Sequence, residues 1–231
     1  MSCFLSVADD RELCLLSDAG AWDSEGRIFA LDRKIHVSQR FPVAITTRGS
    51  HALGRIQATN MITMFDRYGV DWGLYLFHEL CSAPEMQADP RHGINGCLHW
   101  HVGAFSPTVG PIRLSFHNMP HAFSDGHEPG KCYEVTETYA AGTPADAYPD
   151  VPARFPFETL SSFTRRSGPA IFDAWRRTPT VPFGYDRKQY LCAGWVDMVT
   201  ITRKRAYVET IHKWPDMVGE IVGPEAAYVA H

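Results

Sequence analysis

Segments with strand-type and helix-type patterns follow one another along this chain in an order that few architectures accommodate. Strand-type runs come first, then two helical stretches, further strand-type runs, one more helix and a final pair of strands. The early strands are predicted at residues 4–7, 13–16, 35–37 and 43–46, where short apolar or β-branched runs are bounded by turn residues. A meander of strands therefore begins almost at residue 1.

Two helices are predicted in the next part of the chain. Apolar residues recur at intervals of 3.6 residues from Ala58 to Tyr68, which predicts one helix that Gly69 closes. A second helix is predicted to start at Asp71 as its N-cap and to stop before Pro84.

The second half of the chain returns to strands. They are predicted at residues 97–105, 112–116 and 133–139, and a loop over residues 141–157 leads to a helix over residues 157–177. Two last strands, residues 195–202 and 206–214, are joined by a basic hairpin turn. This order predicts an α+β fold with two sheets between helical layers, in a single domain over residues 1–231.

Composition excludes several classes of partner. The formal net charge is −4, which favours neither nucleic acid nor an anionic membrane. No run approaches the roughly 18 apolar residues of a membrane span, and the start of the chain lacks the pattern of a secretory signal. The six cysteines lack CxxC spacing and lie mostly in apolar runs, so we expect reduced thiols and a cytoplasmic location.

A set of residues near the start of the chain predicts chemistry. Ser2 would be the first residue once Met1 is removed; Asp18 follows it by sixteen positions and Lys34 by thirty-two. Asp18 ends an apolar run, and Lys34 precedes a short strand. In spacing and context the chain resembles the N-terminal nucleophile (Ntn) hydrolases, in particular subunits of the 20S proteasome and HslV. The resemblance extends weakly along most of the chain, through the strand ending at Gly49, the turn up to Thr143 and the segment from Cys192 to Gly194.

The resemblance implies a four-layer αββα sandwich and a hydrolase of amide or peptide bonds that acts through an acyl-Ser2 intermediate. Ser2 would supply both the nucleophilic hydroxyl and, with its α-amine, the base. Lys34 would lower the pKa of that amine, Asp18 would orient Lys34, and the N–H of Gly49 would stabilise the oxyanion. Thr143 would place a hydroxyl nearby. A homo-oligomeric ring or stack is also implied, with no cofactor.

The chain departs from the family pattern at two positions. Gln189 stands where the family has a second carboxylate, and Cys192 stands where it has a serine. Gln189, together with retention of Met1, would favour an alternative function, a catalytically inactive subunit with a structural or assembly role. Cys3 is a rival nucleophile, but its use would require removal of two residues and would break both spacings.

The histidines permit a third hypothesis, a zinc-binding module. His99 and His101 alternate on one strand, and His117, His121 and His127 follow, although zinc sites usually show tighter spacing or a carboxylate in register. The simpler interpretation is strand and loop histidines without a metal. Glycine-rich phosphate-binding motifs are absent from the sequence.

Overall fold

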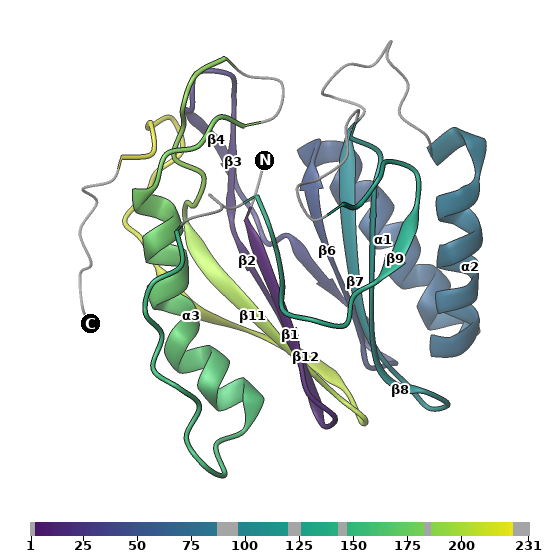
Figure 1. The fold of residues 1–231 in the computed structure, drawn as a ribbon. Coiled ribbons are helices and arrows are strands. Elements are labelled where there is room, and N and C mark those ends of the chain that lie inside the picture. Colours follow the sequence, from purple (N-terminus) through teal and green to yellow (C-terminus); the bar gives the residue numbers. More distant parts are fainter. Residues whose placement is uncertain (1–2, 87–96, 120–125, 143–146, 183–185, 224–231) are drawn as a thin grey trace.

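The computed structural model describes residues 3–86, 97–119, 126–142, 147–182 and 186–223 (Figure 1). The strands in chain order are β1 (Phe4–Ala8), β2 (Glu12–Asp18), β3 (Gly20–Trp22), β4 (Ile28–Leu31), β5 (Ile35–Val37), β6 (Val43–Gly49), β7 (Leu98–Ser106), β8 (Gly110–His117), β9 (Cys132–Glu134), β10 (Tyr139–Ala141), β11 (Trp195–Thr202) and β12 (Ala206–Lys213). The helices are α1 (His51–Tyr68), α2 (Val70–Ser82), the short 3₁₀ helix η1 (Pro84–Met86) and α3 (Leu160–Arg177).

The strands pair into antiparallel sheets. The first sheet has the order β10-β1-β2-β11-β12, the second has the order β5-β6-β7-β8-β9, and β3 and β4 form a small separate pair. Helix α3 packs on the first sheet, and α1 with α2 packs on the second sheet, on its side away from the first (Figure 1). The protein is therefore of the α+β type, as the order of its elements predicts.

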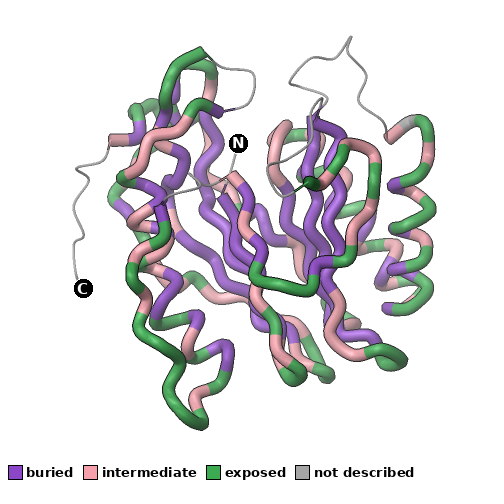
Figure 2. The backbone as a smooth tube through the Cα atoms, viewed as in Figure 1, coloured by how far each residue is buried: buried purple, intermediate pink, exposed green. Residues whose placement is uncertain are grey.

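The inner faces of the two sheets meet along their length, but their contact changes in character. At one end, β2, β5, β6, β7 and β11 bring together an apolar cluster of Leu13, Leu15, Ile35, Ala44, Phe105, Val199 and Ile201. Toward the other end, the facing side chains include histidines and other polar groups, although the strands remain buried (Figure 2). Gly103 of β7 allows the close approach, because a Cβ there would meet the side chain of Leu13 on the opposite sheet.

The prediction of one strand over residues 133–139 is wrong, because the chain passes from one sheet to the other within this range. Cys132–Glu134 pairs with β8 in the second sheet, whereas Tyr139–Ala141 pairs with β1 in the first. Val135 and Tyr139 are both buried against Phe4, whereas residues 136–138 between them are exposed. Alternation reports which side chains are buried and not which strand is the partner.

Helix boundaries also differ from those predicted. Helix α1 begins at His51, a full two turns early, because its first buried contact is made by Gly54, which an apolar pattern cannot reveal. A Cβ at that position would meet Thr47 of β6. The N-cap of α2 is Gly69 and not Asp71, whose carboxylate instead accepts hydrogen bonds from the hydroxyls of Ser106 and Thr108.

Other predicted boundaries are closer to the structure. Thr159 caps α3 by accepting a hydrogen bond from the N–H of Ser162 at 3.1 Å, so this helix starts three residues after the predicted position. The basic turn between β11 and β12 is confirmed by a 2.9 Å bond from the N–H of Thr202 to the carbonyl of Arg205. The β3–β4 pair was missed, because its strands are too short to show a period.

We predict that Phe172→Ala lowers the free energy of unfolding by about 3–5 kcal/mol, because it leaves a cavity between α3 and the first sheet. Phe172 is fully buried there. Phe157→Ala is the matched control, since the Phe157 side chain is fully exposed. Urea unfolding should place the control within about 0.5 kcal/mol of the parent protein; equal losses in both variants would contradict this account of the core.

Candidate functional site

The carboxylate of Asp18 lies at the end of β2 and is the most densely bonded buried charge near the start of the chain. Its Oδ1 accepts hydrogen bonds from the N–H of Cys3 at 2.9 Å and from Lys34 Nζ at 3.2 Å. Its Oδ2 accepts from the N–H groups of Gly20 at 3.1 Å and Ala193 at 3.3 Å. A carboxylate has about four lone-pair sites, and four donors occupy them. The geometry therefore fits the ionised form.

Burial acts against the charge on both members of the Asp18–Lys34 pair. Desolvation raises the pKa of Asp18, and the charge of Lys34 and the backbone N–H donors oppose this rise. Desolvation likewise lowers the pKa of Lys34, while the charge of Asp18 opposes the fall. Both side chains are almost completely removed from solvent, so the mutual contact is what keeps them charged.

Lys34 is held on other sides as well. Its ammonium donates to the carbonyl of Gly20 and lies 5.2 Å from the centre of the Trp22 ring, over its face. A cation in this position is attracted by the ring electrons. Gly20 must lack a side chain, because a Cβ there would collide with Trp22 and Ala193. The β3 strand, absent from the predicted elements, thus positions the predicted lysine.

A second ion pair lies beside the first and was missed by sequence reasoning. Arg33 Nε donates at 2.9 Å to Asp197 Oδ2 on β11, and that carboxylate also accepts from Trp195 Nε1 at 3.0 Å and Thr210 Oγ1 at 2.6 Å. Asp197 pairs in register with Ser17, the neighbour of Asp18. The adjacent cations at positions 33 and 34 therefore bind two neighbouring strands of the first sheet.

The segment from Cys192 to Gly194 is held in place by a buried ion pair between α3 and the segment that follows β12. Arg176 donates to Asp216 at 2.6 and 2.8 Å and to the carbonyl of Cys192 at 2.7 Å. Asp216 accepts in turn from the N–H of Gly194 at 2.7 Å. These hydrogen bonds fix the backbone around Ala193, whose N–H donates to Asp18.

Gly49 ends β6 at a position that no other residue fits well. Its φ is +110°, and a Cβ would meet the backbone carbonyl of Cys97. The N–H of Ser50 donates to that carbonyl at 3.0 Å. Because N–H groups alternate in direction along an antiparallel ladder, the N–H of Gly49 points away from β7, to the side on which β5 lies. Lys34 immediately precedes β5.

The remaining predicted site residues, Ser2 and Thr143, lie outside the described residues. Their neighbours lie close together: the thiol of Cys3 donates to the carbonyl of Gly142 at 2.9 Å. The structure therefore brings together Asp18, Lys34 and the residue after Ser2.

The two departures from the family pattern have distinct surroundings. The amide of Gln189 donates from Nε2 to the carbonyl of Ser24 at 2.9 Å, so it is bonded to the loop between β3 and β4. The Cys192 thiol is fully buried, and burial together with the neighbouring Cys3 thiol raises its pKa. Neither side chain is among the partners of the Asp18 carboxylate.

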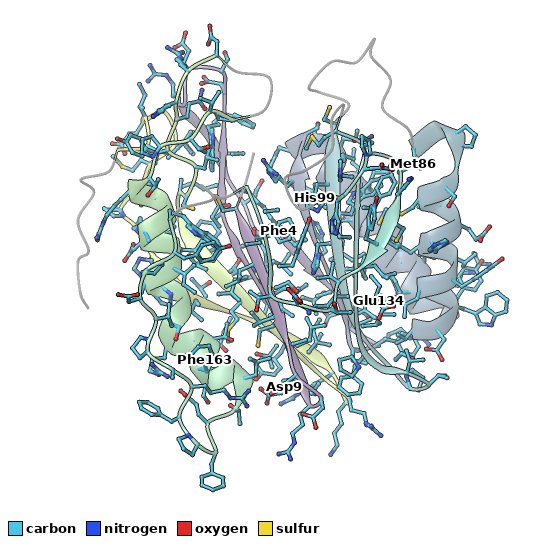
Figure 3. The ribbon with its side chains drawn as sticks, viewed as in Figure 1. Phe4, Asp9, Met86, His99, Glu134 and Phe163 are labelled. Atoms are coloured by element: carbon cyan, nitrogen blue, oxygen red, sulfur yellow. The ribbon has the colours of Figure 1, made fainter. Side chains whose placement is uncertain are left out.

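A cluster of aromatic and imidazole rings fills the polar end of the space between the sheets. We call this set the imidazole cluster; it comprises Phe4, His99, His101, Ser115, His117, His127 and Tyr139. Phe4 of β1 and His99 of β7 face one another across the two sheets, with ring centres 5.0 Å apart (Figure 3). His99 Nε2 bonds to Ser115 Oγ at 2.9 Å, and the hydroxyl of Tyr139 lies 3.4 Å from it.

His101 is the least satisfied member of the cluster. Its side chain is fully buried, and among the described residues neither ring nitrogen has a hydrogen-bond partner. It stacks on Tyr139 with ring centres 5.3 Å apart. Desolvation, together with the charges of Arg113 and His127, lowers its pKa to about 3. His101 is therefore neutral near pH 7.

The hypothesis of a zinc-binding module finds no support in the described part of the chain. No group of three or more His, Cys, Asp or Glu side chains there is arranged to hold a metal ion. His121 lies outside that part.

None of the helices that the structure describes has the length and apolar character of a membrane span.

Comparison with known proteins gives no family for this chain. No protein-family model matches it, and no curated protein sequence matches it. The functional inference below therefore depends on the geometry of the site and on the spacing of its residues.

We predict that Gly49→Ala destabilises the protein by more than Gly110→Ala. Both glycines have positive φ, so each substitution costs about 1–2 kcal/mol in backbone strain. Only the Cβ at position 49 also meets a backbone carbonyl, while the one at position 110 meets open space. Urea unfolding of the two variants separates the strain from the collision, and equal losses would show that β6 and β7 can move apart.

We also predict that acid destabilises the fold through the imidazole cluster. Between pH 6.5 and about 3, the unfolded chain binds a proton at His101 that the folded chain excludes. The stabilisation is thus complete above pH 6.5 and declines as the pH falls, by up to about 1.4 kcal/mol per unit. Burial also lowers the pKa of His99 well below its usual value, which adds to the effect.

Urea unfolding at several pH values should give a shallower slope for His101→Leu than for the parent protein. His78→Gln, which changes an exposed side chain of α2, controls for the loss of a histidine as such. An unchanged slope in His101→Leu would mean that His101 is protonated in the folded state.

Proposed function

We propose that the protein is an N-terminal serine hydrolase of the Ntn type, which cleaves an amide or peptide bond through an acyl-Ser2 intermediate. The observation that carries this proposal is the buried contact of Lys34 with Asp18 at the amide that follows Ser2. Lys34 Nζ and the N–H of Cys3 donate to the same carboxylate oxygen, so the cation is a neighbour of the first peptide group of the mature chain.

The proposed reaction uses the two groups of Ser2 in sequence. The hydroxyl oxygen attacks the substrate carbonyl, and the α-amine takes up the hydroxyl proton. The tetrahedral intermediate collapses, the α-ammonium gives its proton to the leaving amine, and an ester to Ser2 remains. Water then hydrolyses the ester by the same route and releases the acid.

The surroundings of Lys34 suit the task of tuning the α-amine. An ammonium close to a second amine favours the neutral form of that amine, which lowers its pKa toward neutral pH. Asp18 keeps the cation in place, and the described partners of Lys34 use two of its three hydrogens. The N–H of Gly49, directed to the side of β5, would donate to the oxyanion.

The arrangement of elements supports the proposal at the level of the fold. We infer that α3, the two five-stranded sheets, and α1 with α2 correspond to the four layers of an αββα sandwich. By the same resemblance we propose a homo-oligomeric ring or stack with a peptide or amide substrate. The cytoplasm is the compartment proposed with it, in keeping with six free cysteines.

A second candidate is a subunit with this fold and no catalytic activity. The bond of Gln189 to Ser24 favours it, because the family carboxylate at that position supports the α-amine and this amide is engaged elsewhere. Under this alternative the Asp18–Lys34 pair serves only to hold the start of β1 against its neighbours.

We predict that the mature protein starts at Ser2 and that a β-lactone or epoxyketone probe labels Ser2. Intact mass and peptide mapping measure both. Labelling should fall at least about 100-fold in Lys34→Met, since general-base assistance is typically worth that much. Lys188→Ala, on an exposed side chain, should label normally.

The lysine variant needs a check on folding, because an unpaired buried Asp18 costs about 3–5 kcal/mol. The double variant Asp18→Asn/Lys34→Met removes both charges and should recover much of that stability while remaining unlabelled. A free Ser2 that no probe labels in the folded parent protein would refute the hydrolase and leave the structural subunit.

A further inference from the structure

Two thiols from distant parts of the chain meet at the outer edge of the second sheet. Cys81 lies near the end of α2, and Cys132 is the first residue of β9, the edge strand of that sheet. The helix and the strand lie side by side (Figure 1). Both cysteines pack into the apolar cluster between α1, α2 and the second sheet, and their thiols are close enough for each to shift the pKa of the other.

The two thiols of this pair differ in access and acidity. Cys81 is fully buried, whereas Cys132 is half-buried. The hydrogen bond from Cys81 lowers the pKa of Cys132 against the opposing effect of burial. Burial raises the pKa of Cys81. This arrangement supplies a reachable thiol with increased thiolate character and a protonated partner beside it.

The other four cysteines lack this combination. Cys3 and Cys192 are also in contact with each other, but both are fully buried. Cys14 is fully buried, and desolvation raises its pKa to about 12. Cys97 is 5% exposed. All six cysteines lie within the described residues, and Cys132 alone among them is not buried.

We propose that Cys132 and Cys81 form a peroxide-sensitive dithiol, a modification site separate from the proposed hydrolase chemistry. The Cys132 thiolate attacks hydrogen peroxide, which gives a sulfenic acid and releases hydroxide. The Cys81 thiol then attacks the sulfenic sulfur, which gives the Cys81–Cys132 disulfide and water. The two thiols lose two electrons in total, and peroxide accepts them.

The disulfide would join the end of α2 to a strand that is otherwise held weakly. Among the described strands, β9 pairs with β8 alone, through three residues from Cys132 to Glu134. Tyr133, the second residue of β9, stacks on His127 of the imidazole cluster, with ring centres 4.3 Å apart. Oxidation would therefore fix the edge of the second sheet at the point where it supports the cluster.

The test treats the folded, reduced protein with hydrogen peroxide and maps its peptides. We expect one Cys81–Cys132 disulfide, a mass loss of about 2 Da that dithiothreitol reverses, and a higher melting temperature. In Cys81→Ser, the sulfenic acid at Cys132 should persist and react with dimedone. In Cys132→Ser, Cys81 should stay reduced.

The Cys3–Cys192 pair is the matched control, because it has the same thiol contact without access. Cys3→Ser should leave oxidation of the Cys81–Cys132 pair unchanged, and the parent protein should keep Cys3 and Cys192 reduced. The proposal is overturned if Cys132 reacts no faster than Cys14, or if peroxide converts Cys132 to the sulfinic acid without a disulfide. Formation of the disulfide only after unfolding would overturn it equally.

Discussion

The arrangement of the proposed site depends on the hydrogen bonds that the Asp18 carboxylate accepts. Four donors reach it from separate segments of the chain: the start of β1, the start of β3, the residue before β5 and the turn before β11. A buried charge is tolerated only when such partners replace its hydration. Because each donor is a backbone N–H or a single ammonium, the four segments must keep their relative positions for the charge to remain satisfied.

Between the two sheets, too, buried polar groups need hydrogen-bond partners. Sheets that face each other usually bury apolar side chains, and the end around Leu15 and Val199 follows that rule. The other end buries rings with polar atoms, of which His101 is unsatisfied by the described residues. Such groups cost stability unless they are paired. The chain therefore carries an unsatisfied buried imidazole beside the segment that contains Cys3 and Gly142, where the proposed chemistry would occur.

Much of this architecture could be predicted from the sequence, because strands and helices have periods that the chain displays. The contact of Asp18 with Lys34 was predicted as well, as an implication of the resemblance to the Ntn hydrolases. The Arg33–Asp197 and Arg176–Asp216 pairs could not be, since a charged residue in a sequence does not show which distant partner it meets. The change of sheet between Glu134 and Tyr139 was missed for a similar reason: the apolar side chains of Val135 and Tyr139 predict burial but not the sheet that each segment joins.

The geometry also bears on how well the proposed enzyme would work. Gln189 is bonded to Ser24, and Cys192 contributes a buried thiol, so neither adds a charge near the α-amine. In the proposed enzyme, Lys34 would lower the pKa of that amine, with its own charge maintained by Asp18 and by the face of Trp22. When one cation lowers the pKa of an amine, the size of the shift depends on the distance between the two groups. A catalytic site of this kind would require a fixed position for Lys34, which the hydrogen bonds of Asp18 provide. In a purely structural subunit, the same hydrogen bonds would serve stability alone.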